Sequence, residues 1–99
     1  MARFHVYPNP DGPGLLLDCQ ADLLDMLATR FVVPLFADGD VPRPIPRLMP
    51  ILVVKGQPHV MATPYAATIP ARLLTAPIER LDAAAPTIMN ALDLLLTGC

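Results

Sequence analysis

The sequence contains no serine and no tryptophan, and only two cysteines occur among its 99 residues. The absence of serine excludes hydrolases that use a serine nucleophile. Cys19 alternates with polar neighbours in a strand pattern, so we expect it in the core, where a thiol stays protonated and unreactive. Cys99 ends the sequence and is expected to be an exposed thiol without a catalytic role. In a reducing compartment both thiols stay free, and we predict no disulfide.

Patterns that bind metals or phosphates are also missing. His5 and His59 lie far apart in the chain, and no CxxC or HxxxH motif occurs. A metal site needs several ligands at set spacings, so each histidine is expected to lie on a strand surface. The DGPG stretch at 11–14 has glycines but lacks the lysine and the strand–helix context of a phosphate loop. The sequence therefore predicts neither a metal nor another cofactor.

Charged residues make up only 16% of the chain, where about 25% is usual, and the net charge is −2. One lysine and six arginines without a basic run do not suit a protein that binds nucleic-acid phosphates or an anionic membrane surface. No apolar stretch approaches the roughly 18 residues of a membrane span, and the first residues lack the apolar segment of a signal peptide. We therefore expect a cytoplasmic protein that contacts neither nucleic acid directly nor a membrane.

Hydrophobic residues, in contrast, make up 54% of the sequence. A chain of this length fits a single domain, residues 1–99, with a high ratio of surface to volume. Such a chain is too short to cover so much apolar surface by itself, and large exposed apolar patches mark contacts with partners. The composition therefore predicts a homo-oligomer.

Alternation of apolar and polar residues predicts strands in most of the chain. In the second of them, Leu17, Cys19 and Ala21 are predicted to face the core. Pro34 cannot donate to a ladder, which implies a sheet edge or a bulge at that position. The segment 37–47 has no such pattern and is expected to be a mobile excursion. The predicted strands span 3–7, 15–22, 30–36, 49–56, 59–63 and 68–74.

The last segment changes to helical spacing. Asp82 is the predicted N-cap, and Pro86 falls in the first turn, where proline is tolerated. Leu94 is predicted to lie opposite the buried stripe, as an exposed contact residue. The predicted stripe consists of Ala85, Ile88, Met89, Leu92, Leu95 and Leu96. The whole pattern predicts a mainly β fold with a C-terminal α-helix, in which a small antiparallel sheet or partly open barrel of about five strands is covered by the helix on one face.

Three carboxylates, Asp18, Asp22 and Asp25, cluster in the sequence. Paired acids can act as general acid and base, but a solvated strand face followed by a turn is the simpler explanation. An acid–base ribonuclease that combines Asp25, Arg30 and His59 is an alternative, although the weak basicity of the chain counts against it. The residues of the sequence therefore favour a binding protein over an enzyme.

Four segments together resemble the CcdB (control of cell death B) toxin family. They are LDCQADLLD at 17–25, RFVVPL at 30–35, PILVVKG at 50–56 and NALDLL at 90–95. The similarity covers nearly the whole chain, and its most specific parts are D-x-Q-x-D at 18–22 and R-x-V-x-P-L at 30–35. The resemblance implies an SH3-like barrel of about five strands with a small extra sheet and a carboxyl-terminal helix. The ribonuclease toxins of the Kid and MazF type share this fold.

The resemblance also implies a function. Members of the family are toxins of type II toxin–antitoxin pairs. They form homodimers partly through the carboxyl-terminal helices, and a disordered segment of a CcdA-like antitoxin neutralises them. They are not enzymes but bind the A subunit of DNA gyrase and trap the cleaved complex. The alternatives are a Kid-like or MazF-like ribonuclease toxin, or a degenerate member that binds only its antitoxin.

Target-binding residues follow from the same resemblance. The two aliphatic residues that contact gyrase after D-x-Q-x-D correspond to Leu23 and Leu24. The best-known members end in Phe-Trp-Gly-Ile, where this chain has Leu-Thr-Gly-Cys at 96–99. Thr97 therefore replaces a tryptophan that stacks on an arginine of gyrase, and Asp93 replaces a helix asparagine. The predicted target-binding residues are Leu23, Leu24, Leu94, Thr97, Gly98 and Cys99.

Overall fold

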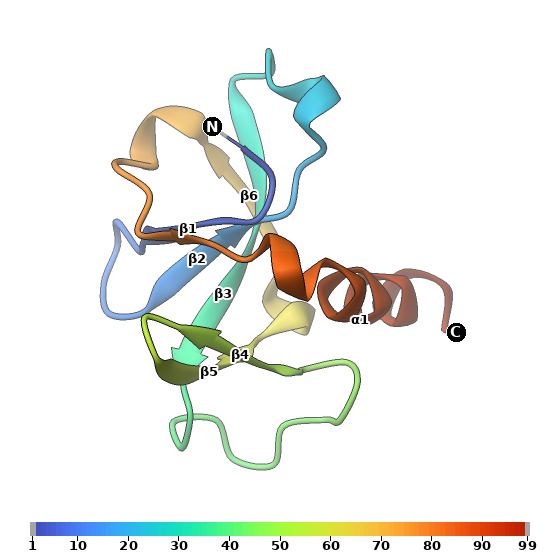
Figure 1. The fold of residues 1–99 in the computed structure, drawn as a ribbon. Coiled ribbons are helices and arrows are strands. Elements are labelled where there is room, and N and C mark those ends of the chain that lie inside the picture. The colour runs from blue at the N-terminus through green and yellow to red at the C-terminus, as the bar shows by residue number, and fades with distance from the viewer. Residues whose placement is uncertain (1, 99) are drawn as a thin grey trace.

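An antiparallel sheet and a carboxyl-terminal helix make up the protein, with short 3-10 turns between the elements (Figure 1). The structure is a computed structural model and describes residues 2–98. The helix is α1 (Ala85–Thr97), and the turns are η1 (Asp22–Leu24), η2 (Thr63–Tyr65), η3 (Ala71–Leu73) and η4 (Asp82–Ala84). The strands are β1 (His5–Pro8), β2 (Leu15–Asp18), β3 (Thr29–Ala37), β4 (Ile51–Val54), β5 (Gln57–Met61), β6 (Ala67–Pro70) and β7 (Glu79–Arg80).

The strands are ordered β4-β5-β3-β2-β1-β7, and β6 also pairs with β3. The two ends of the sheet meet where the backbone N–H of Lys55, just after β4, donates to Oε2 of Glu79 in β7 at 2.8 Å. The sheet is therefore a nearly closed barrel. Together with α1 it confirms the predicted mainly β fold, a small antiparallel barrel with one carboxyl-terminal helix. Strand β7 was not predicted, because two residues are too few to show a periodic pattern.

The long strand β3 is central, with partners along both of its edges. One edge pairs with β2, while the other pairs with β6 over Thr29–Val32 and with β5 over Leu35–Ala37. Pro34 lies between these two partners, so its missing N–H interrupts neither ladder. Its carbonyl accepts a hydrogen bond from the N–H of Ala62 at 2.9 Å. The prediction of an edge or a bulge at Pro34 is therefore wrong, because the residue marks a change of partner within a central strand.

Strands β4 and β5, which correspond to the predicted strands at 49–56 and 59–63, form a hairpin with Lys55 and Gly56 as its two turn residues. These two residues have φ values of 51° and 76°, the left-handed conformation that a two-residue hairpin turn requires. Two predicted strands are shorter in the structure: the one at 68–74 ends at Pro70 and is followed by η3, and the one at 15–22 ends at Asp18. The segment at 37–47 is largely irregular, and its mobility stays a prediction.

Both faces of the sheet are buried, and this overturns one prediction. The larger cluster lies on the face that packs against α1 and includes Cys19, which is buried as predicted. Asp18 and Gln20, predicted to be solvated on the other side of the strand, are 0% and 8% exposed. The reason is that segment 67–74 folds over this second face, where Ile69 packs against a smaller cluster. That cluster consists of Tyr7, Leu16, Val32 and Leu74.

Helix α1 packs on the larger cluster through the middle of its predicted stripe. Its fully buried residues are Ile88, Ala91 and Leu92. Leu95 and Leu96, predicted to be buried, are 40% and 74% exposed, because the helix extends past the edge of the sheet (Figure 1). Leu94, predicted to be exposed, is half-buried. The stripe is therefore correct for the first turns of the helix and wrong for the last one.

The start of α1 differs from its prediction in the capping residue. Pro86 lies in the first turn, as expected, but the N-cap position is Ala84 and no side chain caps it. Asp82 instead begins η4, and its carboxylate pairs with Arg80 at 2.7 Å on the surface. No helix within residues 2–98 is both long enough and apolar enough to cross a membrane.

The substitution Ile88→Ala tests the contact between α1 and the sheet. Because Ile88 is fully buried, we expect the free energy of unfolding to fall by about 2–5 kcal/mol. Leu23→Ala removes a side chain that is 83% exposed, and it should change this free energy by less than about 0.5 kcal/mol. Urea denaturation of both variants measures the difference. Equal losses would contradict the described packing.

Candidate functional site

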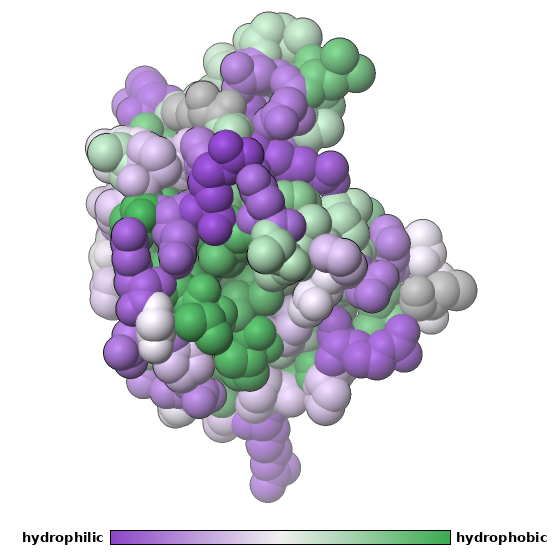
Figure 2. All heavy atoms as spheres, in the orientation of Figure 1, coloured by the Kyte–Doolittle hydropathy of each residue, from purple (hydrophilic) through white to green (hydrophobic). Residues whose placement is uncertain are grey.

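Four large apolar side chains are exposed on the segment that joins β2 to β3. Leu23 is 83% and Met26 76% exposed, and Leu24 and Leu27 are close to half exposed. Residues 22–27, called the 22–27 turn below, begin with η1 and protrude from the sheet. Figure 2 shows green, apolar surface at the upper right, where the turn lies in Figure 1, next to purple, hydrophilic atoms. Apolar side chains gathered on a surface in this way are typical of a contact with a partner.

A buried ion pair lies at the base of this turn. The side chains of Arg30 in β3 and Asp18 in β2 have no exposed surface. Nε of Arg30 donates to Oδ2 of Asp18 at 2.9 Å, and Nη2 lies 2.7 Å from the same oxygen without a well-aligned hydrogen bond. Nη1 donates to Oδ1 of Asp25 at 3.0 Å, and Asp25 belongs to the turn itself. One buried guanidinium therefore connects the turn to two strands.

Gln20 connects the turn to the sheet a second time. Its Nε2 donates to the carbonyl of Leu24 at 3.0 Å, and its Oε1 accepts from the N–H of Phe31 at 3.0 Å. The N–H of Gln20 itself donates to Oδ1 of Asp18 at 3.1 Å. Burial of these groups protects their hydrogen bonds from competing water. The D-x-Q-x-D motif therefore supports the turn, a role that the sequence reasoning missed.

Arg3 connects the 22–27 turn to helix α1. Its backbone N–H donates to Oδ1 of Asp22 at 2.8 Å, and its Nη2 donates to Sδ of Met89 at 2.9 Å. The guanidinium also lies over the ring of Phe4, 4.8 Å from the ring centroid. An arginine at the start of a predicted strand gives no sequence signal for such a connection. The turn and the helix are nevertheless held to the same residue, the turn by its backbone and the helix by its side chain.

The last turn of α1 is a second exposed apolar segment. Gly98 has a φ of 77°, and its N–H donates to the carbonyl of Leu94 at 3.0 Å, the usual left-handed end of a helix. Oγ1 of Thr97 donates to the carbonyl of Asp93 at 2.7 Å. Figure 1 shows the 22–27 turn and the end of α1 on the same side of the sheet, with the helix below the turn. Cys99 lies outside the described residues.

The predicted target-binding residues therefore lie in two places. Leu23 and Leu24 are exposed on the 22–27 turn, and Thr97 and Gly98 are exposed at the end of α1, whereas Leu94 is half-buried. The apolar surface at these two places is larger than predicted. The resemblance pointed only to the leucine pair and to the chain end, so it gave no signal for the further exposed residues Met26, Leu27 and Leu95.

Only two of the three residues of the alternative ribonuclease site come together. Arg30 is fully buried and pairs with Asp25 at the amino end of β3. His59 in β5 lies opposite Ala37, at the other end of β3. At a rise of roughly 3.3 Å per residue, Ala37 is about 23 Å from Arg30 along the strand. A general acid and a general base must both reach the same bond, so these three residues form no common site.

The remaining titratable candidates give no reactive centre. Burial, and after it the negative charge of Asp18, raises the pKa of the Cys19 thiol to about 12, so the thiol stays protonated near neutral pH. Of the clustered carboxylates, Asp22 and Asp25 are exposed, as predicted for a turn, and only Asp18 is buried. Within the described part of the chain, no three His, Cys, Asp or Glu side chains gather where a metal ion would fit.

The substitution Asp18→Asn tests the ion pair under the turn. It leaves the guanidinium of Arg30 buried without its main counter-charge, and we expect a loss of about 3–5 kcal/mol in the free energy of unfolding. Asp82→Asn breaks the exposed pair with Arg80 and should cost no more than about 1 kcal/mol. Urea denaturation of both variants provides the comparison, and similar small losses would show that the buried pair is not important for stability.

Comparison with known proteins agrees with the fold and with the position of the two exposed segments. Among the solved structures that resemble the chain is the Mycobacterium tuberculosis toxin MazF-mt6, with a TM-score of 0.70 over 90% of each chain. The two sequences are only 19% identical, so this likeness shows a common fold alone. A search of the curated proteins finds no match. The CcdB protein family, in contrast, matches residues 3–98, which include the 22–27 turn and the end of α1. The chain therefore belongs to the CcdB family.

Proposed function

We propose that the chain is the toxin of a type II toxin–antitoxin pair, and that it binds the A subunit of DNA gyrase and traps the cleaved complex. Membership of the CcdB family supports this role. The observation that carries the proposed mechanism is the 22–27 turn, where Leu23 and Leu24 are exposed on a backbone held by Gln20 and Arg30. A surface that is ordered before it binds loses less conformational entropy in the complex.

The end of α1 is the proposed second contact, and part of this helix is the proposed interface of a homodimer. The high apolar content and the exposed side chains of Leu95 and Leu96 support both roles. Ile51 and Val53 of strand β4, at one end of the sheet, add further exposed apolar surface. A twofold axis would present each contact segment twice. Such symmetry suits binding at the dimer axis of gyrase, where the family contacts its target.

The proposed mechanism is not enzymatic, and the proposed partner that neutralises it is a CcdA-like antitoxin. The burial of Arg30 and its distance from His59 support a mechanism by binding. Ribonuclease activity is the competing proposal because the MazF-mt6 toxin shares the fold. Incubation of the purified protein with RNA separates the two proposals. RNA cleavage that is lost in His59→Ala would favour the ribonuclease, and intact RNA after prolonged incubation would remove it.

Leu23→Asp tests the role of the 22–27 turn. A charge in an apolar contact is costly to bury, so we expect the variant to lose both inhibition of supercoiling and trapping of cleaved DNA by gyrase. Its stability should stay unchanged because the side chain is 83% exposed. The matched control is Ile45→Asp, which changes another exposed apolar residue, 52% exposed, between β3 and β4.

The wild-type protein decides the target in the same assay. Wild-type protein that neither inhibits gyrase nor traps cleaved DNA at micromolar concentration would exclude gyrase as the target. If the wild type and Leu23→Asp inhibit gyrase equally well, gyrase is supported as the target, but the proposed contact through the 22–27 turn is contradicted. Activity lost equally in Ile45→Asp would show that the assay reports any added charge.

Thr97→Trp tests whether the end of α1 contacts gyrase. The substitution restores the aromatic ring that stacks on an arginine in the best-known members, and such a stack contributes about 0.5–2 kcal/mol. We therefore expect gyrase to bind about 2- to 30-fold more tightly. Thr87→Trp, at an exposed position in the first turn of α1, is the control and should leave the affinity unchanged. Calorimetry with the A subunit measures both, and weaker binding by Thr97→Trp would contradict the proposed contact.

A further inference from the structure

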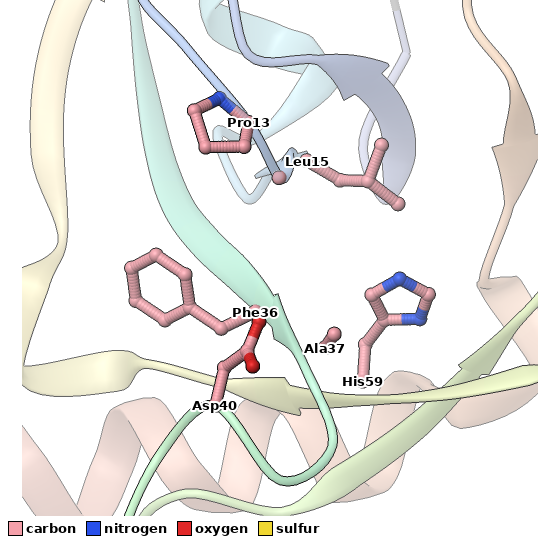
Figure 3. A pocket seen from close by; sticks show the side chains of 7 residues that line it. Pro13, Leu15, Phe36, Ala37, Asp40 and His59 are labelled. Atoms are coloured by element: carbon pink, nitrogen blue, oxygen red, sulfur yellow. The ribbon is translucent and has the colours of Figure 1, made fainter.

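A pocket of about 370 Å³ lies at the carboxyl end of β3, away from the 22–27 turn at the other end of this strand. Figure 3 shows one of its walls built from the loop between β1 and β2 and the start of β2, and the other from the end of β3, the segment that follows it, and His59 of β5. Its volume is near the lower limit of small-ligand pockets, about 300 Å³, so it suits one side chain or a single ring. The labelled lining residues are Pro13, Leu15, Phe36, Ala37, Asp40 and His59.

The polar groups in this pocket accept hydrogen bonds. Asp40 contributes an exposed carboxylate. Nδ1 of His59 lies 3.0 Å from the carbonyl of Gln57, and since a carbonyl can only accept, this contact is a hydrogen bond in the tautomer that carries its proton on Nδ1. In the neutral ring, Nε2 is then an acceptor. Phe36 adds an aromatic wall, whose face attracts cations. The pocket therefore suits a flat, positively charged donor.

The charge around the pocket disfavours an anionic ligand. No lysine or arginine is among the described residues that line it. Asp11 lies in the loop between β1 and β2 and Asp38 in the segment after β3, the two segments that border the pocket, and both residues are exposed. A nucleobase is also a flat donor, but the phosphate of a nucleotide would meet these carboxylates, and no arginine or lysine among the described lining residues would balance its charge. The same carboxylates attract a cationic partner.

Arginine fits the pocket better than lysine does. A guanidinium is planar, stacks on aromatic rings and forms two parallel hydrogen bonds with one carboxylate. The ammonium of lysine is strongly hydrated and cannot stack. We propose that this pocket binds an arginine side chain of a partner protein, stacked on Phe36 and hydrogen-bonded to Asp40 and His59. The site shares no residue with the 22–27 turn or with the end of α1, so it goes beyond the proposed function.

Titration of ¹⁵N-labelled protein with N-acetyl-arginine methylamide, followed by NMR, tests the proposal. We expect amide shifts confined to residues 14–15, 36–40 and 57–60. The citrulline analogue has the same shape without the charge, and the lysine analogue has the charge without the plane, so both should bind more weakly. Asp40→Asn should weaken arginine binding about tenfold or more, because it removes a charge-assisted hydrogen bond. Asp82→Asn changes an exposed aspartate that does not line the pocket, so it is the matched control and should bind like the wild type.

The outcomes of this titration support or overturn the proposal. Shifts in the pocket that are lost in Asp40→Asn and kept in Asp82→Asn support it. It is overturned if arginine causes no shift in the pocket, if citrulline binds equally well, or if both variants bind alike. Tighter binding of guanosine monophosphate than of arginine would also overturn it and would assign the pocket to a nucleotide. None of these results depends on gyrase, so the proposed function is tested separately.

Discussion

The buried guanidinium of Arg30 is the interaction on which the exposed surface of this protein depends. It bonds to Asp18 inside the sheet and to Asp25 in the 22–27 turn, so the geometry of the turn follows from that of the strands. Burying a charge costs several kcal/mol unless partners surround it, and these two carboxylates supply that compensation. The usual distribution of side chains between core and surface is inverted here. The charged side chains of Asp18 and Arg30 are buried, whereas apolar side chains such as Leu23 face water.

This inversion explains how an apolar turn can stay in one place without an apolar core of its own. Leu23 and Met26 contribute little to folding because most of their surface is exposed. The turn is held instead by hydrogen bonds from Gln20, Arg30 and Arg3, and the last of these also reaches α1. The two candidate contact segments are thus joined through a polar network, which leaves their apolar side chains available to a partner.

The sequence predicted the elements better than it predicted the site. Alternation identified the two strands β4 and β5, and helical spacing identified α1, because these patterns are local. Alternation of apolar and polar residues shows which residues share a face of a strand. It does not show whether another part of the chain packs on that face, and for this reason the sequence predicts a solvated Asp18. The segment that covers it is about 50 residues further along the chain.

Helical spacing likewise gives no sign of where the sheet beneath α1 ends, which is why the sequence predicts a buried Leu95. The resemblance identified the exposed leucine pair, but a pattern of residue types cannot show the network that supports it.

Backbone ¹⁵N relaxation of the free protein is the most direct test of this account. If the buried ion pair and Gln20 hold the 22–27 turn in place, the order parameters of residues 22–27 should be close to those of the strands, about 0.85. Values below about 0.6 in the turn, next to an ordered sheet, would show that the turn is flexible before it meets a partner. That result would contradict the claim that the buried network presents a preformed surface.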